Sequence, residues 1–393
     1  LDNFRYRDQR GINQFEAPKD TVTTFDGVHV RVGGASTIQF QTLSQENDGP
    51  LELVDLGNNF NLATANLDLD VALYDGVRMH LRTYLSSQHH NEAYVKGGYI
   101  QVDKLNFISE GFAEDLMDHL RIKIGHMENN YGDAHFRRTD NAMALYNPFV
   151  GNYLMDSFTT EVGAEVYLFN KGWLGMLGIT NGKLNQAVTN PETTSPSFLA
   201  KVGYDNTVAP DLRLRLTGSV YKTNQTGSAY LYSGDRAGSR YYNVMTAADG
   251  TGDGFRAGRI NPDLKNEMTS FMINPFLKYK GLEFFGIFET ATGKKSTESD
   301  NRTWNQYAGE FIYRFGPTEN LYVGGRYNVV DGELEGGADV SVNRFQLAAG
   351  WFMTKNIMMK VEYVNQDYKD YPVIDIHNDG KFKGLSFEAA ISF

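Results

Sequence analysis

Residues 385–393, Leu-Ser-Phe-Glu-Ala-Ala-Ile-Ser-Phe, carry the pattern that decides the fold. Every second residue from Leu385 to Phe393 is apolar, and three of the four residues between them are polar. A period of two predicts a β-strand with one apolar and one polar face. Chain ends are poorly ordered unless they are tied down, so we expect this strand to pair along its whole length. A soluble all-β domain accounts for this single stretch as well as a barrel does.

The composition favours a β-protein and excludes several other classes. The 393 residues suffice for two or three ordinary domains or for one large barrel. They include 40 Gly, 23 Tyr and 25 Phe but only 10 Pro, a mixture that favours strands, turns and aromatic belts. No apolar run reaches 18 residues, which excludes a transmembrane helix. A net charge of -11 argues against a nucleic-acid surface, and the lack of Cys excludes disulfides, thiolate metal sites and Cys nucleophiles.

Residues 1–26 differ from the rest because they are charged and have no hydrophobic period. We interpret them as an N-terminal arm, and residues 27–393 as one barrel domain. The arm is either loosely held, or enters the pore, or docks a partner. Leu1 is not followed by a signal-peptide pattern, so an exported protein is expected to have this sequence as its mature form.

From residue 28 onward, alternating segments follow one another to the end of the chain, and about sixteen of them are long enough to cross a bilayer as tilted strands. The predicted strands are 28–40, 59–74, 76–87, 93–107, 119–128, 157–168, 172–180, 197–204, 212–222, 267–279, 281–290, 303–315, 320–329, 342–353, 357–366 and 383–393.

The connections between these strands alternate between short and long. Asp75-Gly76, Asn170-Lys171 and Lys280-Gly281 are tight turns, and 108–118 and 205–211 are moderately longer. The connections that alternate with these short ones are long, as in 129–156 and 223–266, and the one exception is the brief connection at 88–92. A β-sandwich has no reason to sort its connections in this way, whereas an outer-membrane barrel has short periplasmic turns and long external loops. The even strand count also places both termini on the short-turn side.

The alternation assigns a direction to each face. In 76–87, for example, apolar residues such as Val77 and Leu81 alternate with Arg78, His80 and Arg82. A barrel of sixteen strands is too wide for side chains of its wall to fill, so the apolar faces are expected to meet lipid and the polar faces to surround water. The fold class is therefore all-β, a transmembrane antiparallel β-barrel. Pro275 within 267–279 predicts a bulge or a strand end, because Pro cannot donate to a ladder.

The series 28–393 resembles a sixteen-stranded gram-negative outer-membrane porin and is similar to the phosphate-selective porin O and P family and its general-porin relatives. The terminal Phe393 resembles the end of the closing strand of such barrels. The stretch from Gly125 to Asp133 and on through Tyr146 to Tyr153 follows the fifth strand, where these porins carry the third external loop, which folds inward. The resemblance implies a homotrimer in the outer membrane, in contact with lipid and lipopolysaccharide, that passes small hydrophilic solutes and ions by passive diffusion. The dense inward Arg and Lys ladders of the phosphate-selective members are not found here.

Loop 129–156 is the candidate pore constriction. It is too long for a turn, and charges on it and at its edge can orient dipolar solutes across a narrow passage. An external flap with solvated charges is the alternative. The candidate constriction residues are Glu128, Asp133, Arg137, Arg138 and Asp140.

The wall opposite is expected to be basic. The alternation directs more bases than acids inward, although the whole chain has 48 acids and 37 bases. The lumen is therefore expected to prefer anions mildly, unless these side chains only pair with one another across strands and stiffen the wall. The candidate wall residues are Arg78, Arg82, Arg121, Lys123, Arg213 and Arg215.

Nothing in the sequence predicts an enzyme, a cofactor or a metal site. No nucleophile elbow, Walker loop or His-Glu-x-x-His motif is present. The segment that starts at Asp249 resembles a calcium loop, but Ile260 stands at the twelfth position, where a bidentate Glu is needed. The leading hypothesis is a general diffusion porin. An anion- or phosphate-selective channel and a plugged barrel that serves as a structural partner subunit are the alternatives.

Overall fold

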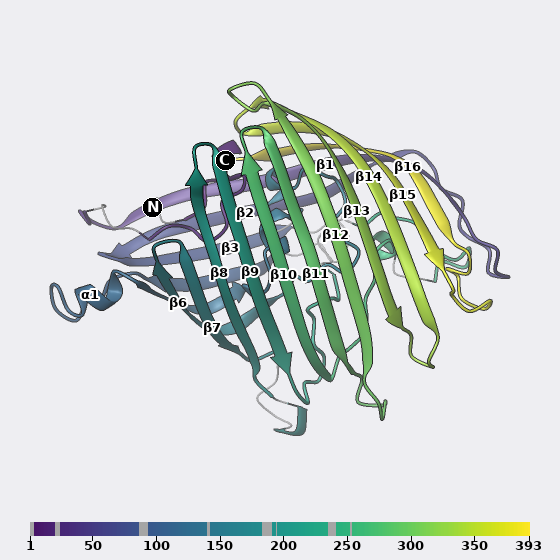
Figure 1. The fold of residues 1–393 in the computed structure, drawn as a ribbon, viewed down its shortest axis with the longest axis horizontal. Helices are drawn as coiled ribbons and strands as arrows, with labels where there is room; N and C mark the ends of the chain where they lie inside the picture. Colours follow the sequence, from purple (N-terminus) through teal and green to yellow (C-terminus); the bar gives the residue numbers. More distant parts are fainter. Residues whose placement is uncertain are drawn as a thin grey trace.

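The computed structural model describes residues 4–19, 24–85, 93–139, 142–182, 191–193, 195–234, 241–251 and 254–393. Sixteen antiparallel strands form one closed barrel (Figure 1). They are β1 (His29–Glu46), β2 (Asn59–Tyr74), β3 (Val77–Leu85), β4 (Ala93–Val102), β5 (Leu120–Glu128), β6 (Thr160–Asn170), β7 (Trp173–Thr180), β8 (Ser197–Ala209), β9 (Leu212–Thr223), β10 (Glu267–Tyr279), β11 (Leu282–Lys294), β12 (Arg302–Phe315), β13 (Leu321–Glu333), β14 (Asp339–Thr354), β15 (Ile357–Lys369) and β16 (Lys381–Ser392).

The last strand closes the barrel against the first, and residues 385–392 pair along their length as expected. Along β16, Phe387 lies opposite Phe40 of β1, and Ser392 lies opposite Ala35. Beyond the end of β16, Phe393 and Gly34 exchange two backbone hydrogen bonds of 3.0 Å. This pairing removes the free edges that an open sheet would expose. The sixteen strands and their closure confirm the predicted fold class.

The connections are sorted between the two ends of the barrel. One end has tight turns, and the β2–β3 turn needs Gly76, which has a φ of +70° and no room for a Cβ beside Lys104. Two connections at this end differ from the prediction. The β8–β9 connection is only residues 210–211, because β8 continues to Ala209, and the β4–β5 connection spans 103–119 with one helical turn, α1 (Glu114–Met117). Within the described ranges, no helix is long and apolar enough to cross a membrane.

The outer face of the wall is apolar. Outward side chains such as Leu177, Leu216 and Phe311 are 70%, 56% and 59% exposed. The residues between them point inward and are buried, as the burial pattern of β14 shows. Aromatic side chains such as Tyr279 and Phe315 lie at strand ends, next to the turns. An apolar belt with aromatic residues at its border is the surface that hydrocarbon and headgroups favour.

Pro275 forms neither a bulge nor a strand end, so that prediction was wrong. Pro275 lies in the middle of β10, opposite Leu216 of β9, and the register with β11 is the same on both sides of it. The neighbouring side chain replaces the missing donor: Asn274 Nδ2 donates to the Gly286 carbonyl of β11 at 3.0 Å. The ladder therefore keeps its register without the backbone N–H that Pro lacks.

Candidate functional site

The β5–β6 connection (residues 129–159) is attached to inward-facing side chains of the wall. Asp133 makes the densest contacts: Arg215 Nε and Nη2 of β9 lie 2.8 and 2.9 Å from its two carboxylate oxygens, and Lys201 Nζ of β8 lies 2.6 Å away. The Asp133 backbone N–H donates to Asn274 Oδ1 at 2.8 Å. Burial alone would raise the pKa of Asp133, but Arg215 and Lys201 hold it well below its usual range.

Arg137 is a second attachment point of this connection. It donates to Glu310 of β12 at 2.6 Å and lies 3.8 Å from Glu283 of β11. Glu310 also accepts from Arg326 of β13 at 2.9 Å and from the Tyr153 hydroxyl at 2.8 Å. One wall carboxylate thus holds two separate parts of the connection.

The other predicted constriction residues are placed differently. Arg138 contacts Asp156 of its own connection at 2.5 Å and the Tyr241 hydroxyl at 3.0 Å. Glu128 ends β5 and lies 2.5 Å from His135 Nδ1. Asp140 lies outside the described residues. The four predicted charges that the structure describes therefore do not gather into one cluster, and of these four Asp133 and Arg137 reach the far wall.

Several attachments that the sequence analysis did not single out hold the distal part of the connection. Glu362 of β15 accepts from the backbone N–H groups of Val150 and Gly151 at 2.8 and 3.2 Å. Asn328 of β13 accepts from the Leu154 N–H at 2.8 Å, and Lys360 of β15 donates to three carbonyls at 2.9–3.0 Å. Glu362 and Lys360 lie on the polar face of the period-two alternation, but alternation gives no signal for their partners in a loop.

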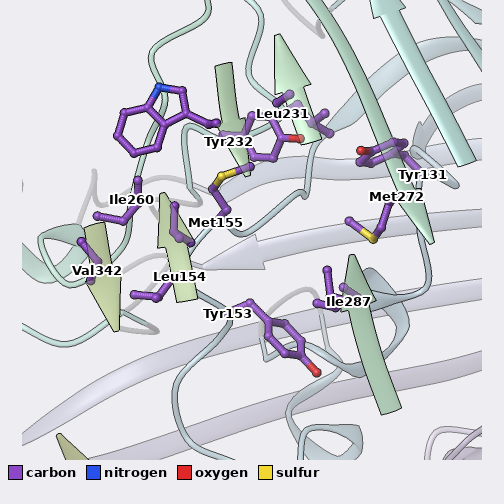
Figure 2. Close-up of a cluster of buried hydrophobic side chains, with 14 of the residues drawn as sticks. Tyr131, Tyr153, Leu154, Met155, Leu231, Tyr232, Ile260, Met272, Ile287 and Val342 are labelled. Carbon is purple, nitrogen blue, oxygen red and sulfur yellow. The ribbon is translucent and has the colours of Figure 1, made fainter. Parts of the chain in front are cut away.

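An apolar cluster occupies the lumen, and its wall residues come from β6–β16 and β1, with the largest share from β10–β14. Figure 2 shows part of it. Tyr153, Leu154 and Met155 of the β5–β6 connection contribute to it, and so do Leu231, Tyr232 and Ile260 of the β9–β10 connection (224–266). Inward residues of the wall complete the cluster, including Met272, Ile287 and Val342. The inner face is thus not polar throughout, because part of it is covered by protein and not by water.

The predicted wall residues all lie on inward positions, and most have acidic partners. Arg82 donates to Asp68 at 2.7 Å, and Arg121 donates to Asp103 at 2.9 Å. Lys123 is 3.8 Å from Glu165, Arg213 donates to Asp205 at 2.7 Å, and Arg215 binds Asp133. Arg78 donates to the carbonyls of Tyr74 and Val77 at 3.0 and 3.2 Å.

Two further inward acids offset the basic excess that the alternation suggested. Glu283 and Glu289 of β11 are both buried on the inner face. Arg314 donates to Glu283 at 2.7 Å, while Glu289 accepts from Tyr131, Tyr232 and Gln306. Glu289 therefore lies among neutral donors.

The N-terminal arm, residues 4–19, also lies against inward side chains. Arg7 binds Asp68 and Asp70 of β2, and Glu16 lies 3.1 Å from Lys201 and 2.7 Å from Arg215. Asn13 donates to Glu283 at 2.6 Å. Contacts with the turns, such as the 2.8 Å bond from the Gln9 N–H to the Lys355 carbonyl, place the arm at the short-turn end.

A cavity of about 170 Å³ remains between the arm, the β5–β6 connection and the wall of β2–β6. Its basic lining residues outnumber its acidic ones. The bases are Arg5, Arg7, His80, Arg82, Lys96, Arg121, Lys123 and His135, and the acids are Glu16, Asp70 and Glu128. Aromatic rings complete the lining, and Lys123 Nζ is 4.5 Å from the centroid of Tyr99. Such a lining suits small polar or anionic solutes better than apolar ones.

The described residues contain no group of His, Cys, Asp and Glu side chains that could hold a metal ion. Comparison by sequence identifies no relative: no protein-family model matches the chain, and no curated protein matches it.

Solved structures do share the fold. An anion-selective porin from Comamonas acidovorans superposes with a TM-score of 0.61 at 11% identity, covering 93% of this chain and 100% of that one. OmpT, an outer membrane protein of Vibrio cholerae, superposes with a TM-score of 0.56 at 12% identity, covering 95% of this chain and 100% of that one. The outer membrane channel DcaP of Acinetobacter baumannii superposes with a TM-score of 0.56 at 11% identity, covering 95% of this chain and 99% of that one. At these identities the likeness establishes the barrel fold and leaves the function to the residues.

Proposed function

We propose that this protein is a non-enzymatic outer-membrane channel for the passive diffusion of small hydrophilic solutes and ions. The observation that carries the proposal is the charged cavity inside a barrel whose outer face is apolar. The solute path runs along β2–β6, where the cavity lies, because the described wall residues of the apolar cluster lie on β6–β16 and β1 and none on β2–β5. The porin and channel named among the structures with the same fold support this function class.

The β5–β6 connection is the constriction in this proposal. Its attachments at Asp133 and Arg137 draw it toward β8–β13, away from the cavity side. Of the four predicted constriction residues within the described ranges, Glu128 lines the cavity, together with the wall residues Arg82, Arg121 and Lys123. These four side chains would set the field that a passing solute meets.

A preference for anions is a second candidate, favoured by the excess of bases around the cavity. A plugged barrel that serves as a structural subunit is a third, favoured by the apolar cluster and the arm inside the lumen. Specific transport of phosphate has less support, because most bases of the wall are already paired with acids.

Planar-bilayer recording of the purified protein separates the three. Large ohmic steps support a general diffusion channel, and small steps that saturate with anion concentration support a selective one. A folded protein that gives no steps under any tested voltage contradicts the channel and supports the structural role. Heat-modifiable migration in gels confirms the fold in each case.

The remaining assignments belong to the same proposal. The short-turn end, with the arm of residues 1–26, faces the periplasm, and residues 27–393 form the barrel unit in contact with lipid and lipopolysaccharide. A homotrimer is proposed as well, supported by the trimer form of Vibrio cholerae OmpT, whose fold matches with a TM-score of 0.57 at 11% identity. Crosslinking in native membranes tests the trimer.

A further inference from the structure

We infer that residues 4–19 form a displaceable plug for the short-turn mouth of the barrel, an inference that rests on the proposed channel function. The arm crosses the lumen: Gln9 contacts the β14–β15 turn, Arg7 reaches β2, and Asn13 reaches β11. Further along, the carbonyls of Ala17 and Pro18 accept from Arg121 of β5 at 2.6 and 2.8 Å. A segment that touches opposite sides of the wall obstructs the mouth.

The arm is seated by side chains and not by strand pairing. Among the described residues, one backbone hydrogen bond joins the arm to the barrel, from Gln9 to Lys355. The remaining contacts are ion pairs, side-chain hydrogen bonds and ring contacts, such as Phe15 against Phe276 at 5.3 Å between centroids. An element that adds no strand to the sheet can leave without opening the barrel.

The wall residues that form ion pairs with Arg7 and Glu16 of the arm each keep another ion-pair partner when the arm leaves. Asp68 retains Arg82, and Asp70 retains Arg31 at 2.8 Å and His80. On the other side, Arg215 and Lys201 both retain Asp133. A buried charge that loses its only partner destabilises a protein strongly. The wall residues beneath the arm keep a second partner, so the barrel without the bound arm is energetically accessible.

The chain between the arm and the barrel is long enough for the movement. β1 begins at His29, ten residues after Lys19. An extended chain of that length spans about 30 Å. The arm can therefore swing out of the mouth while β1 stays paired with β2 and β16.

Cysteine labelling tests the plug independently of conduction, because the chain has no Cys of its own. Gln101 lines the cavity and is 3% exposed. A small charged thiol reagent should modify Q101C slowly in the full chain and about tenfold faster after deletion of residues 1–19. R7Q/E16Q in the full chain should label at an intermediate rate, since both substitutions weaken the seat.

The matched control is R10Q, because the Arg10 side chain is 59% exposed and pairs with Asp8 of the arm itself. It should label at the rate of the full chain, and S299C in an exposed loop should react equally with and without the arm. Equal labelling of Q101C with and without the arm would overturn the inference, as would a rate for R7Q/E16Q no higher than that of R10Q. Faster labelling of Q101C without any conductance would contradict the proposed channel function but would still support the displaceable arm.

Discussion

Asp133 in the β5–β6 connection and Arg215 in β9 form a two-point ion pair, with N–O distances of 2.8 and 2.9 Å, inside the barrel. The pair joins the loop to the wall, and Lys201 adds a second cation to the same carboxylate. All three side chains are buried. The geometry makes Asp133 one of the main attachments of the connection to the wall.

Asp133→Ala should lower the free energy of unfolding by about 1.5–3 kcal/mol, because it removes charge-assisted hydrogen bonds to Arg215 and Lys201 while Glu16 still contacts both cations. Unfolding in denaturant of protein reconstituted in lipid vesicles, followed by Trp fluorescence, measures the change. Asp300→Ala removes an exposed loop carboxylate and should stay within about 0.5 kcal/mol of the parent. A loss for Asp133→Ala no larger than for this control would show that the pair does not hold the loop.

Asn274→Leu tests the side chain that compensates for Pro275. The substitution removes the donor to Gly286 and the acceptor for the Asp133 N–H, and each unsatisfied buried group costs about 1–3 kcal/mol. The same unfolding assay should show a loss of stability equal to the sum of these two costs. Asn206→Leu, at an exposed position of β8, is the matched control. Equal stability of the two variants would contradict the role given to Asn274.

The sequence predicted the strands well because period-two alternation is a local property. The same alternation places Glu310 and Glu362 on inward faces, but it cannot give their partners, since Arg137 and Val150 reach them through the path of a long loop. Strand 281–290 carries a sequence signal for the cover over its inner face. It has apolar residues on both faces, Phe284 outside and Phe285 inside, and an apolar inner face indicates that protein covers it.

Lys123→Gln should shift the reversal potential in a KCl gradient toward cation preference, if the solute path runs along β2–β6. Lys123 lines the cavity, and its nearest carboxylate, on Glu165, is 3.8 Å away, so the substitution removes a cation without breaking a short ion pair. Lys280→Gln in an exposed turn removes the same charge outside the lumen and should leave the potential unchanged. Identical potentials for the two variants would exclude this path.

Glu16 gives the arm a defined pH dependence. Burial alone would raise the pKa of Glu16, but Arg215 and Lys201 lower it to about 2 from an ordinary value of 4.5. A carboxyl whose pKa is depressed in the seated state stabilises that state fully above its ordinary pKa and loses this effect as the pH falls toward the depressed value. The arm should therefore stay bound from neutral pH to about pH 5, and its release should begin between about pH 4.5 and 2.

Labelling of Q101C by a reagent that reacts with thiols in acid measures the release of the arm. E16Q should remove this acid-dependent component and label faster than the parent at neutral pH, whereas a parent that loosens already between pH 8 and 5 would show that another group controls the arm.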